Sequence, residues 1–127
     1  MLSGPLGEGS VVMRLIDQYR EAIQAAITAI PPGRVSSYGA VARRAGIPGR
    51  ARLVARFLAE GGHGELPWHR VLRSDRRIAF PEGSAGFHEQ VRRLLAEGVV
   101  LRNGRVSRQA TDGNADDLDQ ALWGRHR

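Results

Sequence analysis

Residues 34–62, RVSSYGAVARRAGIPGRARLVARFLAEGG, contain the pattern that decides the fold. Ser36 or Ser37 can cap a short helix that ends near Arg44, because a serine side chain there accepts a hydrogen bond from a first-turn amide. Gly46 is typical of a helix end, since glycine adopts a left-handed conformation easily. A second helix follows and ends at a Gly-Gly pair. Two short helices joined by the tight connection AGIPG predict a helix-turn-helix.

The second of these helices is expected to have an apolar side and a basic side, with Pro48 near its first turn. Its apolar side comprises Leu53, Val54, Phe57 and Leu58. At helical spacing, Arg50, Arg52 and Arg56 point away from that side. The pattern fits a DNA-binding helix, and it also fits an ordinary helical hairpin whose arginines are solvated. Spacing alone leaves both interpretations open.

Apolar residues at helical spacing predict two further helices. One runs over residues 11–30, with Ser10 as a possible cap and PPG at its end. The other runs from Glu82 or Ser84 to Glu97. Its expected buried stripe is Phe87, Val91, Leu94 and Leu95.

The remaining pattern adds a hairpin and two flanking segments. The stretch 99–108, VVLRNGRVSR, predicts two strands around Asn103-Gly104, a pair that suits a type I′ turn. We expect residues 1–10 to be disordered, residues 11–108 to form one domain, and residues 109–127 to form a partly flexible extension. The predicted fold is mostly α with a small β-hairpin, of the winged helix-turn-helix type.

Composition and charge narrow the class of protein. The chain has 127 residues, 42% of them hydrophobic, which suits one domain with a modest core. It has no apolar run of about 18 residues and no secretory pattern, so we expect a cytoplasmic protein without a membrane partner, associated with the nucleoid if it is bacterial. All 19 basic residues are arginine, and the net charge is +6. Residues 14–60 carry eight arginines against three acids, which suggests a polyanionic partner.

The chain contains no cysteine. This absence removes disulfides, thiolate metal sites and thiol nucleophiles together. The four histidines also lack the spacing of metal ligands; they are His63, His69, His88 and His126. We therefore expect neither a metal nor a cofactor.

The motif LPWHRVL, residues 66–72, carries a resemblance to a known family. Together with IPPGRVSSYGAVARRAG, ARLVARFL and RRLLAEGV, it resembles in order and spacing the DNA-binding domain of O6-alkylguanine-DNA alkyltransferases. That family's signature is Pro-Cys-His-Arg, whose cysteine accepts the alkyl group from damaged guanine. Because Trp68 stands at the place of the cysteine, the chain is identified as a member of the cysteine-less branch, the alkyltransferase-like proteins. The resemblance covers roughly residues 15–108.

Trp68 cannot take over the role of the missing cysteine. Alkyl transfer needs a thiolate nucleophile, whereas the indole nitrogen is only a neutral hydrogen-bond donor. Without the motif, a tryptophan beside a proline would be read as part of the core. With the motif, we expect Trp68 and the neighbouring Pro67 to line a base-sized pocket, where stacking on an aromatic ring is worth about 1–3 kcal/mol per base. We therefore expect a protein that is not an enzyme and has no catalytic residue.

The resemblance also implies which residues contact DNA. Tyr38 matches a tyrosine that crowds a backbone phosphate and helps to rotate the target base outward, although an unlabelled tyrosine there would more simply pack the two helices. Arg52 matches an arginine that enters the duplex through the minor groove and fills the space of the flipped base, a role that its stacking guanidinium suits. Ala51 matches a small residue that allows close approach. Expected backbone contacts are Ser37, Arg43, Arg44, Arg50 and, with less support, Arg56.

Other matched residues are expected to shape the pocket. His69 and Glu97 correspond to a relay that activates the cysteine in true alkyltransferases, so here we expect hydrogen-bonding support, as for Arg70. In some alkyltransferase-like proteins a loop arginine covers the lesion, and Pro81 aligns with that position. Three other arginines of the loop could reach the pocket instead: Arg73, Arg76 and Arg77. Trp123, beyond an acidic insertion at 112–119, is a tentative match to a late aromatic residue of the family.

The function implied by the resemblance is a non-enzymatic damage sensor. It would bind double-stranded DNA, flip O6-alkylguanine into the Trp68 pocket, and pass the lesion to nucleotide excision repair proteins, acting as a monomer. The alternative is a sequence-specific winged-helix transcription regulator, against which the PWHR motif counts because a regulator needs no such loop. An active alkyltransferase is a third option, which the missing cysteine opposes.

Overall fold

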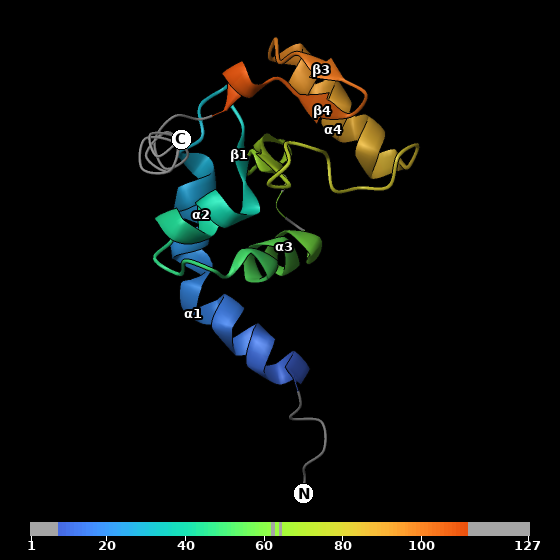
Figure 1. The fold of residues 1–127 in the computed structure, drawn as a ribbon. Coiled ribbons are helices and arrows are strands. Elements are labelled where there is room, and N and C mark those ends of the chain that lie inside the picture. Colours follow the sequence, from blue (N-terminus) through green and yellow to red (C-terminus); the bar gives the residue numbers. More distant parts are fainter. Residues whose placement is uncertain (1–7, 62, 64, 112–127) are drawn as a thin grey trace, which may run out of the picture.

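The computed structural model describes residues 8–61, 63 and 65–111. The α-helices are α1 (Glu8–Thr28), α2 (Tyr38–Arg44), α3 (Ala51–Ala59) and α4 (Ala85–Ala96). The strands are β1 (Ser36–Ser37), β2 (Val71–Leu72), β3 (Leu101–Arg102) and β4 (Arg105–Val106), and the 3-10 helices are η1 (Trp68–Arg70) and η2 (Arg108–Ala110). Figure 1 shows α1, α2 and α3 grouped at one end of the molecule and α4 with the β3–β4 hairpin at the other, with β1 and η1 between them. The predicted mostly helical architecture with a small hairpin is confirmed.

The first helix begins earlier than its sequence pattern suggests. α1 starts at Glu8, so Ser10 lies inside the helix and is not its cap. The last three of the ten residues expected to be disordered are therefore helical, and the first seven lie outside the described residues. The apolar stripe is buried as expected, with Ile16, Ile23 and Ile27 fully inaccessible. Among the described helices, none is long and apolar enough to cross a membrane.

The helix-turn-helix is confirmed in its local detail. The Ser37 side-chain oxygen accepts a hydrogen bond from the Ala40 amide at 3.1 Å, which caps α2. Gly46 has a φ of +85° just after the end of α2, in the left-handed region that glycine tolerates. Pro48 precedes the first turn of α3, which begins at Ala51. The residues Leu53, Val54 and Phe57 of α3 face the core as predicted.

The last helix differs from prediction on its buried side. Ser84 caps α4 by accepting a hydrogen bond from the Phe87 amide at 3.2 Å. Leu95, predicted to be buried, is 56% exposed, whereas Gln90 is only 3% exposed. The Gln90 amide nitrogen can be buried because it donates to the carbonyl oxygens of His69 (2.9 Å) and Val71 (3.2 Å).

The predicted hairpin forms with the predicted turn. β3 and β4 pair antiparallel, with Leu101 opposite Val106. Asn103 and Gly104 both have positive φ, 53° and 76°, which a type I′ turn requires at its two central positions.

A parallel pairing that the sequence pattern does not announce positions the PWHR segment. Ser36 pairs with Val71 and Ser37 with Leu72, so the end of η1 lies beside the start of α2. Because successive strand residues point to opposite sides, Val71 packs into the cluster of α1, α2 and α3, while Leu72 packs into the cluster beside α4 and the hairpin. This short ladder therefore joins the two halves of the core.

A partly buried carboxylate, that of Glu97 just after α4, reinforces the same connection. The Arg70 guanidinium donates to Glu97 with its shortest contact at 2.6 Å, and also donates to the Ile30 carbonyl oxygen at 2.8 Å. The Gly33 amide donates to Glu97 Oε1 at 3.0 Å. His69 Nε2 lies 2.8 Å from Glu97 Oε2. One side chain thus ties the segment after α1, η1 and α4 together.

This network perturbs two ionisable groups. Burial alone would raise the pKa of Glu97, but the hydrogen bonds from Arg70, the Gly33 amide and His69 outweigh it and lower the pKa to about 2. Burial lowers the pKa of His69 below its ordinary value, against the opposing effect of Glu97. His69 is therefore neutral near pH 7, and its Nε2–H donates to the carboxylate, which leaves Nδ1 buried without a partner among the described residues.

Both shifts make the fold sensitive to acid. The unfolded chain binds more protons than the folded chain from about pH 6.5 downward at His69, and between pH 4.5 and about 2 at Glu97. We expect the free energy of unfolding, measured with urea at a series of pH values, to fall as the pH is lowered through these ranges. Glu97→Gln should destabilise the protein at pH 7 by about 2–3 kcal/mol, because it leaves the partly buried Arg70 without its counter-charge. It should also flatten the decline between pH 4.5 and 2.

The exposed Glu82 provides the matched control. Glu82→Gln removes the same charge and should change stability by less than about 0.5 kcal/mol. Equal effects of the two substitutions would contradict the structural role of Glu97.

Candidate functional site

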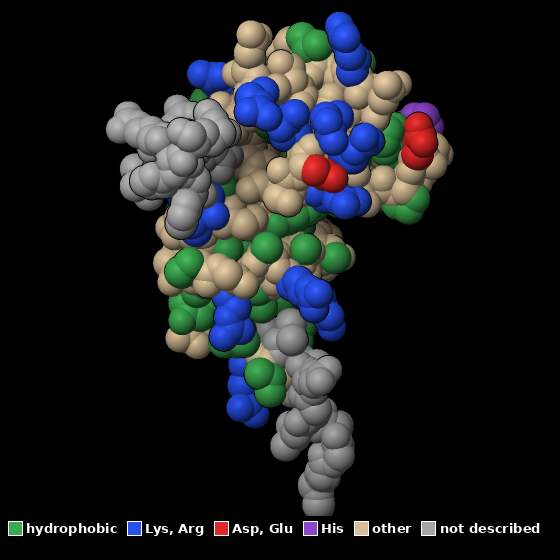
Figure 2. All heavy atoms as spheres, in the orientation of Figure 1, with side chains coloured by type: hydrophobic (Ala, Val, Ile, Leu, Met, Phe, Trp, Pro, Cys, Tyr) green, Lys and Arg blue, Asp and Glu red, His purple; other side chains and the backbone are tan. Residues whose placement is uncertain are grey.

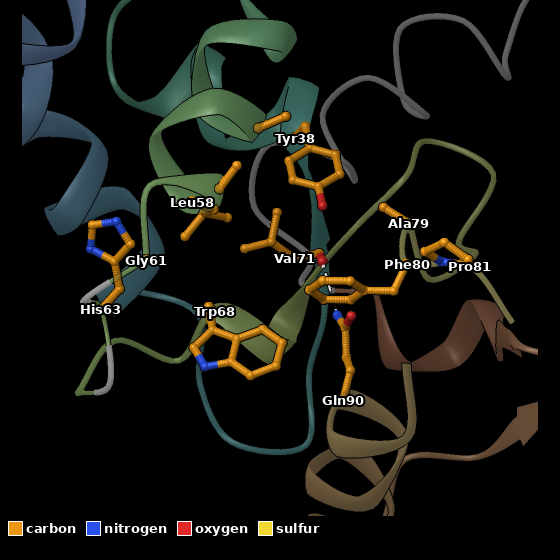
Figure 3. Close-up of a pocket in the computed structure, with 12 residues that line it drawn as sticks. Tyr38, Leu58, Gly61, His63, Trp68, Val71, Ala79, Phe80, Pro81 and Gln90 are labelled. Atoms are coloured by element: carbon orange, nitrogen blue, oxygen red, sulfur yellow. Dashed lines mark hydrogen bonds between the residues drawn. The ribbon is translucent and has the colours of Figure 1, made fainter. Parts of the chain in front are cut away.

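Trp68 lines a cavity instead of filling the core. It opens the 3-10 helix η1 directly after Pro67 and is half-buried. The adjoining cavity has a volume of about 530 Å³, within the range of small-molecule sites in proteins. The lining residues come from five segments of the chain: Tyr38, Ala55, Leu58, Ala59, Gly61, His63, Trp68, Val71, Ala79, Phe80, Pro81 and Gln90. Figure 3 shows the rings of Tyr38, Trp68 and Phe80 around one common space.

Phe80 forms a second aromatic wall. Its ring lies 6.1 Å from that of Trp68, centroid to centroid, at an interplanar angle of 80°. Phe80 is 43% exposed, so it borders the mouth of the cavity. A Cβ atom on Gly86 would come within 2.6 Å of the Phe80 ring. The ring therefore rests directly on the backbone of the first turn of α4, which only glycine allows.

A cation lies over the indole. The Arg93 guanidinium carbon is 5.4 Å from the centre of the Trp68 ring, a cation–π geometry. Arg93 Nε also donates to Glu89 Oε2 at 2.7 Å. This arrangement restricts the indole orientation at the cavity wall.

The polar groups of the cavity are few and largely engaged. The Gln90 amide nitrogen is used by two backbone carbonyls, and His63 Nε2 contacts the Phe57 carbonyl oxygen at 2.7 Å. Burial raises the pKa of Tyr38, so its hydroxyl stays protonated and can donate or accept a hydrogen bond. The cavity thus offers flat apolar walls with Tyr38 as a polar group at one side.

Two predicted lining residues lie at the cavity and two lie behind it. Tyr38 and Trp68 line it. Pro67 precedes the indole without lining the cavity, and the His69 side chain is buried against Glu97. Arg70 and Glu97, expected to support the pocket, both belong to the hydrogen-bond network described above.

The loop arginines do not line this cavity, contrary to prediction. Arg76 has a positive φ of 67°, and its Nε donates to the Val106 carbonyl oxygen at 3.0 Å. Arg77 donates to the Asn103 carbonyl oxygen at 3.3 Å. These contacts turn the loop toward the β3–β4 hairpin, and Arg73 pairs with Asp75 on the surface at 3.5 Å.

The next three residues of the loop, Ala79, Phe80 and Pro81, take the lining position instead. Pro81 is the residue that aligned with the lesion-covering arginine of some relatives. Phe80, Leu58, His63 and Gln90 were not anticipated. A bulky aromatic two residues after a buried isoleucine was the available signal for Phe80, but its direction depends on the packing against Gly86.

The basic side of α3 borders the cavity. Arg50, Arg52 and Arg56 are exposed, and Ala51 is half-buried. Ala55 lines the cavity, and residues three apart on a helix are neighbours, so Arg52 lies one turn from the cavity wall. The arginines of α2 are exposed (Arg43) and partly buried (Arg44). Figure 2 shows further arginine side chains gathered over the upper half of the molecule.

Comparison with known proteins agrees with this geometry. The model of the family "6-O-methylguanine DNA methyltransferase, DNA binding domain" matches residues 18–99. The chain is 40% identical over 87 residues to a DNA base-flipping protein of Vibrio parahaemolyticus, covering 68% of this chain and 85% of that protein. It is also 40% identical over 88 residues to alkyltransferase-like protein 1 of Schizosaccharomyces pombe, covering 68% of this chain and 81% of that protein.

A solved structure extends the similarity to the fold. The crystal structure of S. pombe Atl1 in complex with damaged DNA containing O6-carboxymethylguanine superposes with a TM-score of 0.63 at 33% identity, covering 76% of this chain and 91% of that one. This chain has Trp68 in its PWHR motif, and its full sequence contains no cysteine. The chain therefore belongs to the alkyltransferase-like, DNA base-flipping members of the 6-O-methylguanine DNA methyltransferase DNA-binding domain family.

Proposed function

We propose that this protein binds duplex DNA through the minor groove, flips O6-alkylguanine into the Trp68 cavity and retains it without chemical change. The observation that carries the proposal is the cavity of about 530 Å³ with Trp68 and Phe80 as walls. An aromatic surface beside an open cavity can stack a base, whereas a tryptophan inside the core could not.

The absence of cysteine excludes alkyl transfer to a thiol. An indole ring does not accept the alkyl group at neutral pH. The two residues that match the relay are committed to each other, since His69 pairs with Glu97, and Glu97 also accepts hydrogen bonds from Arg70. The lesion bound by this protein therefore remains a lesion.

Energetics favour selection of a damaged base. Extrusion of a base costs a few kcal/mol and costs less when the base pair is already weakened. Stacking on an aromatic side chain returns about 1–3 kcal/mol per base. Extrusion of an intact, fully paired guanine costs more free energy, whereas its stacking in the cavity gains about the same. The cavity should therefore be filled mainly by weakly paired bases.

The DNA-contacting residues follow from their position around the cavity. Arg52, one turn from the cavity wall, would fill the space of the flipped base, and Tyr38 would press on the backbone beside it. Ala51 would allow close approach of α3. Backbone phosphate contacts are assigned to Ser37, Arg43, Arg44, Arg50 and Arg56. Such contacts position the protein without reading sequence.

A sensor that leaves the lesion in place needs a further repair system. We propose that nucleotide excision repair proteins take over the marked site and that the protein binds as a monomer. The family resemblance supports this assignment.

The first test compares one duplex with and without a single O6-methylguanine, in several unrelated flanking sequences. We expect tighter binding of the modified duplex in every sequence context, measured by fluorescence anisotropy, because the cavity selects the flipped base. Equal binding of modified and unmodified duplexes would contradict the proposal, and a preference for one flanking sequence would indicate a transcription regulator.

The second test removes the arginine next to the cavity. Arg52→Ala should weaken binding of the modified duplex by about 10- to 100-fold, since a few kcal/mol of extrusion cost then lacks compensation. Arg14→Ala, an exposed arginine on α1, removes the same charge and should have a much smaller effect. If both variants lose a similar amount of affinity for the modified duplex, Arg52 contributes only a general phosphate contact.

The third test concerns the second aromatic wall. Phe80→Ala should weaken binding of the modified duplex about tenfold through loss of stacking surface, with little change for unmodified DNA. Gly86→Ala should have an effect in the same direction, because its Cβ displaces the Phe80 ring. Leu95→Ala, an exposed apolar residue on the same helix, is the control. If Phe80→Ala binds the modified duplex as the control does, Phe80 does not contact the base.

A further inference from the structure

A second cavity, on the other side of the β1–β2 ladder from the Trp68 cavity, has a polar and basic lining. It has a volume of about 280 Å³, and we call it the arginine pocket. Its lining residues are Val35, Ser36, Ser37, Arg43, Leu72, Arg73, Ser74, Arg76, Arg108 and Thr111. Four of the ten are arginines, four carry hydroxyl groups, and none is acidic. Such a concentration of positive charge suits an anionic ligand.

The arginine pocket and the Trp68 cavity share a wall. Ser37 and Leu72 line the arginine pocket, whereas the next residue, Tyr38, and the preceding residue, Val71, line the Trp68 cavity. Ser37 and Leu72 are partners in the β1–β2 ladder. Adjacent Cα atoms are only about 3.8 Å apart, so the two cavities lie on either side of one pair of paired segments.

The arginines are placed to receive an oxyanion. Arg76 is fixed by the bond from its Nε to the Val106 carbonyl oxygen, and among the described residues its side chain forms no ion pair. Within the same part of the chain, the Arg108 side chain forms no ion pair. Arg73 pairs with Asp75 at 3.5 Å, but this exposed contact is weak and Asp75 does not line the pocket. Planar guanidinium groups match phosphate oxygens in a bidentate geometry.

We propose that the arginine pocket binds a backbone phosphate that flanks the flipped nucleotide. The inference rests on the function proposed above, since it places the base of that nucleotide in the Trp68 cavity. A single sugar joins a base to its phosphates, and the two cavities are separated only by the Ser37–Tyr38 and Val71–Leu72 segments. A phosphate that flanks a base held in the Trp68 cavity would then be the nearest oxyanion to the arginine pocket, on the other side of the β1–β2 ladder. The pocket therefore strengthens binding of the flipped state more than binding of regular duplex.

The test pairs a charge removal in the protein with a charge removal in the DNA. The protein variant is Arg73→Gln with Arg108→Gln, two exposed residues that can be changed without disturbing the core. The control variant, Arg14→Gln with Arg92→Gln, loses the same charge on α1 and α4. The DNA change replaces one phosphate on either side of an O6-methylguanine, in turn, by an uncharged methylphosphonate. Affinities are measured by anisotropy over a range of salt concentrations.

We expect the Arg73/Arg108 variant to lose at least tenfold affinity for the modified duplex and less for the unmodified one. Its salt slope should fall by about 0.9, the value for one neutralised phosphate. One of the two methylphosphonates should weaken binding by the wild-type protein and by the control variant, but not binding by the Arg73/Arg108 variant, because the two changes remove the same contact.

Two results would overturn the inference. If the protein and DNA changes weaken binding additively, the arginines contact something other than this phosphate. If the Arg73/Arg108 variant keeps the wild-type affinity, the pocket does not bind DNA, and an acidic protein surface would be its remaining ligand. Loss of lesion preference in the wild-type protein would instead contradict the proposed function itself.

Discussion

The Glu97 carboxylate fixes the position on which the rest of the site depends. It accepts hydrogen bonds from the Gly33 amide and Arg70, and it pairs with His69. The parallel pairing of β1 with β2 adds the only backbone ladder between the two halves of the described core. A charge that is largely withdrawn from water must be paired and hydrogen-bonded, so the partners of the partly buried Glu97 hold η1, and with it Trp68, at one location beside α2.

The same residues show how a reactive site can become a binding site. By resemblance, the histidine and glutamate of the family serve a cysteine. Here His69 is neutral and donates to Glu97, and its other ring nitrogen is buried without a partner among the described residues. The pair supports η1 instead of activating a nucleophile. An indole stands where the family has a reactive sulfur. With Arg93 over the ring and Phe80 beside it, this indole offers an aromatic surface for stacking in place of a nucleophile.

Features set by neighbouring residues could be predicted from the sequence. Ser37 and Ser84 cap their helices, Gly46 follows the end of α2, and Asn103-Gly104 forms the hairpin turn. Each of these depends on side chains within a few positions. The motif likewise identified Trp68 and Tyr38, which line the cavity.

Features set by distant contacts could not be predicted. Gln90 is buried because it finds the carbonyl oxygens of η1 and β2, about twenty residues away, and Leu95 is exposed because that role leaves it on the outer side. Phe80 reaches the cavity because its ring packs against the backbone of Gly86, where any side chain would collide with it. The loop arginines turn away because the hairpin offers them carbonyl oxygens. Trp123 and the acidic insertion lie outside the described residues.

The fluorescence of Trp68 reports most directly whether a base enters the cavity. In a Trp123→Phe background Trp68 is the sole tryptophan of the chain. Stacking of a purine against its indole should change the emission when a duplex with O6-methylguanine is added, and unmodified duplex at equal saturation should leave it nearly unchanged. Equal emission with both duplexes, at saturation, would contradict the view that this indole receives the flipped base.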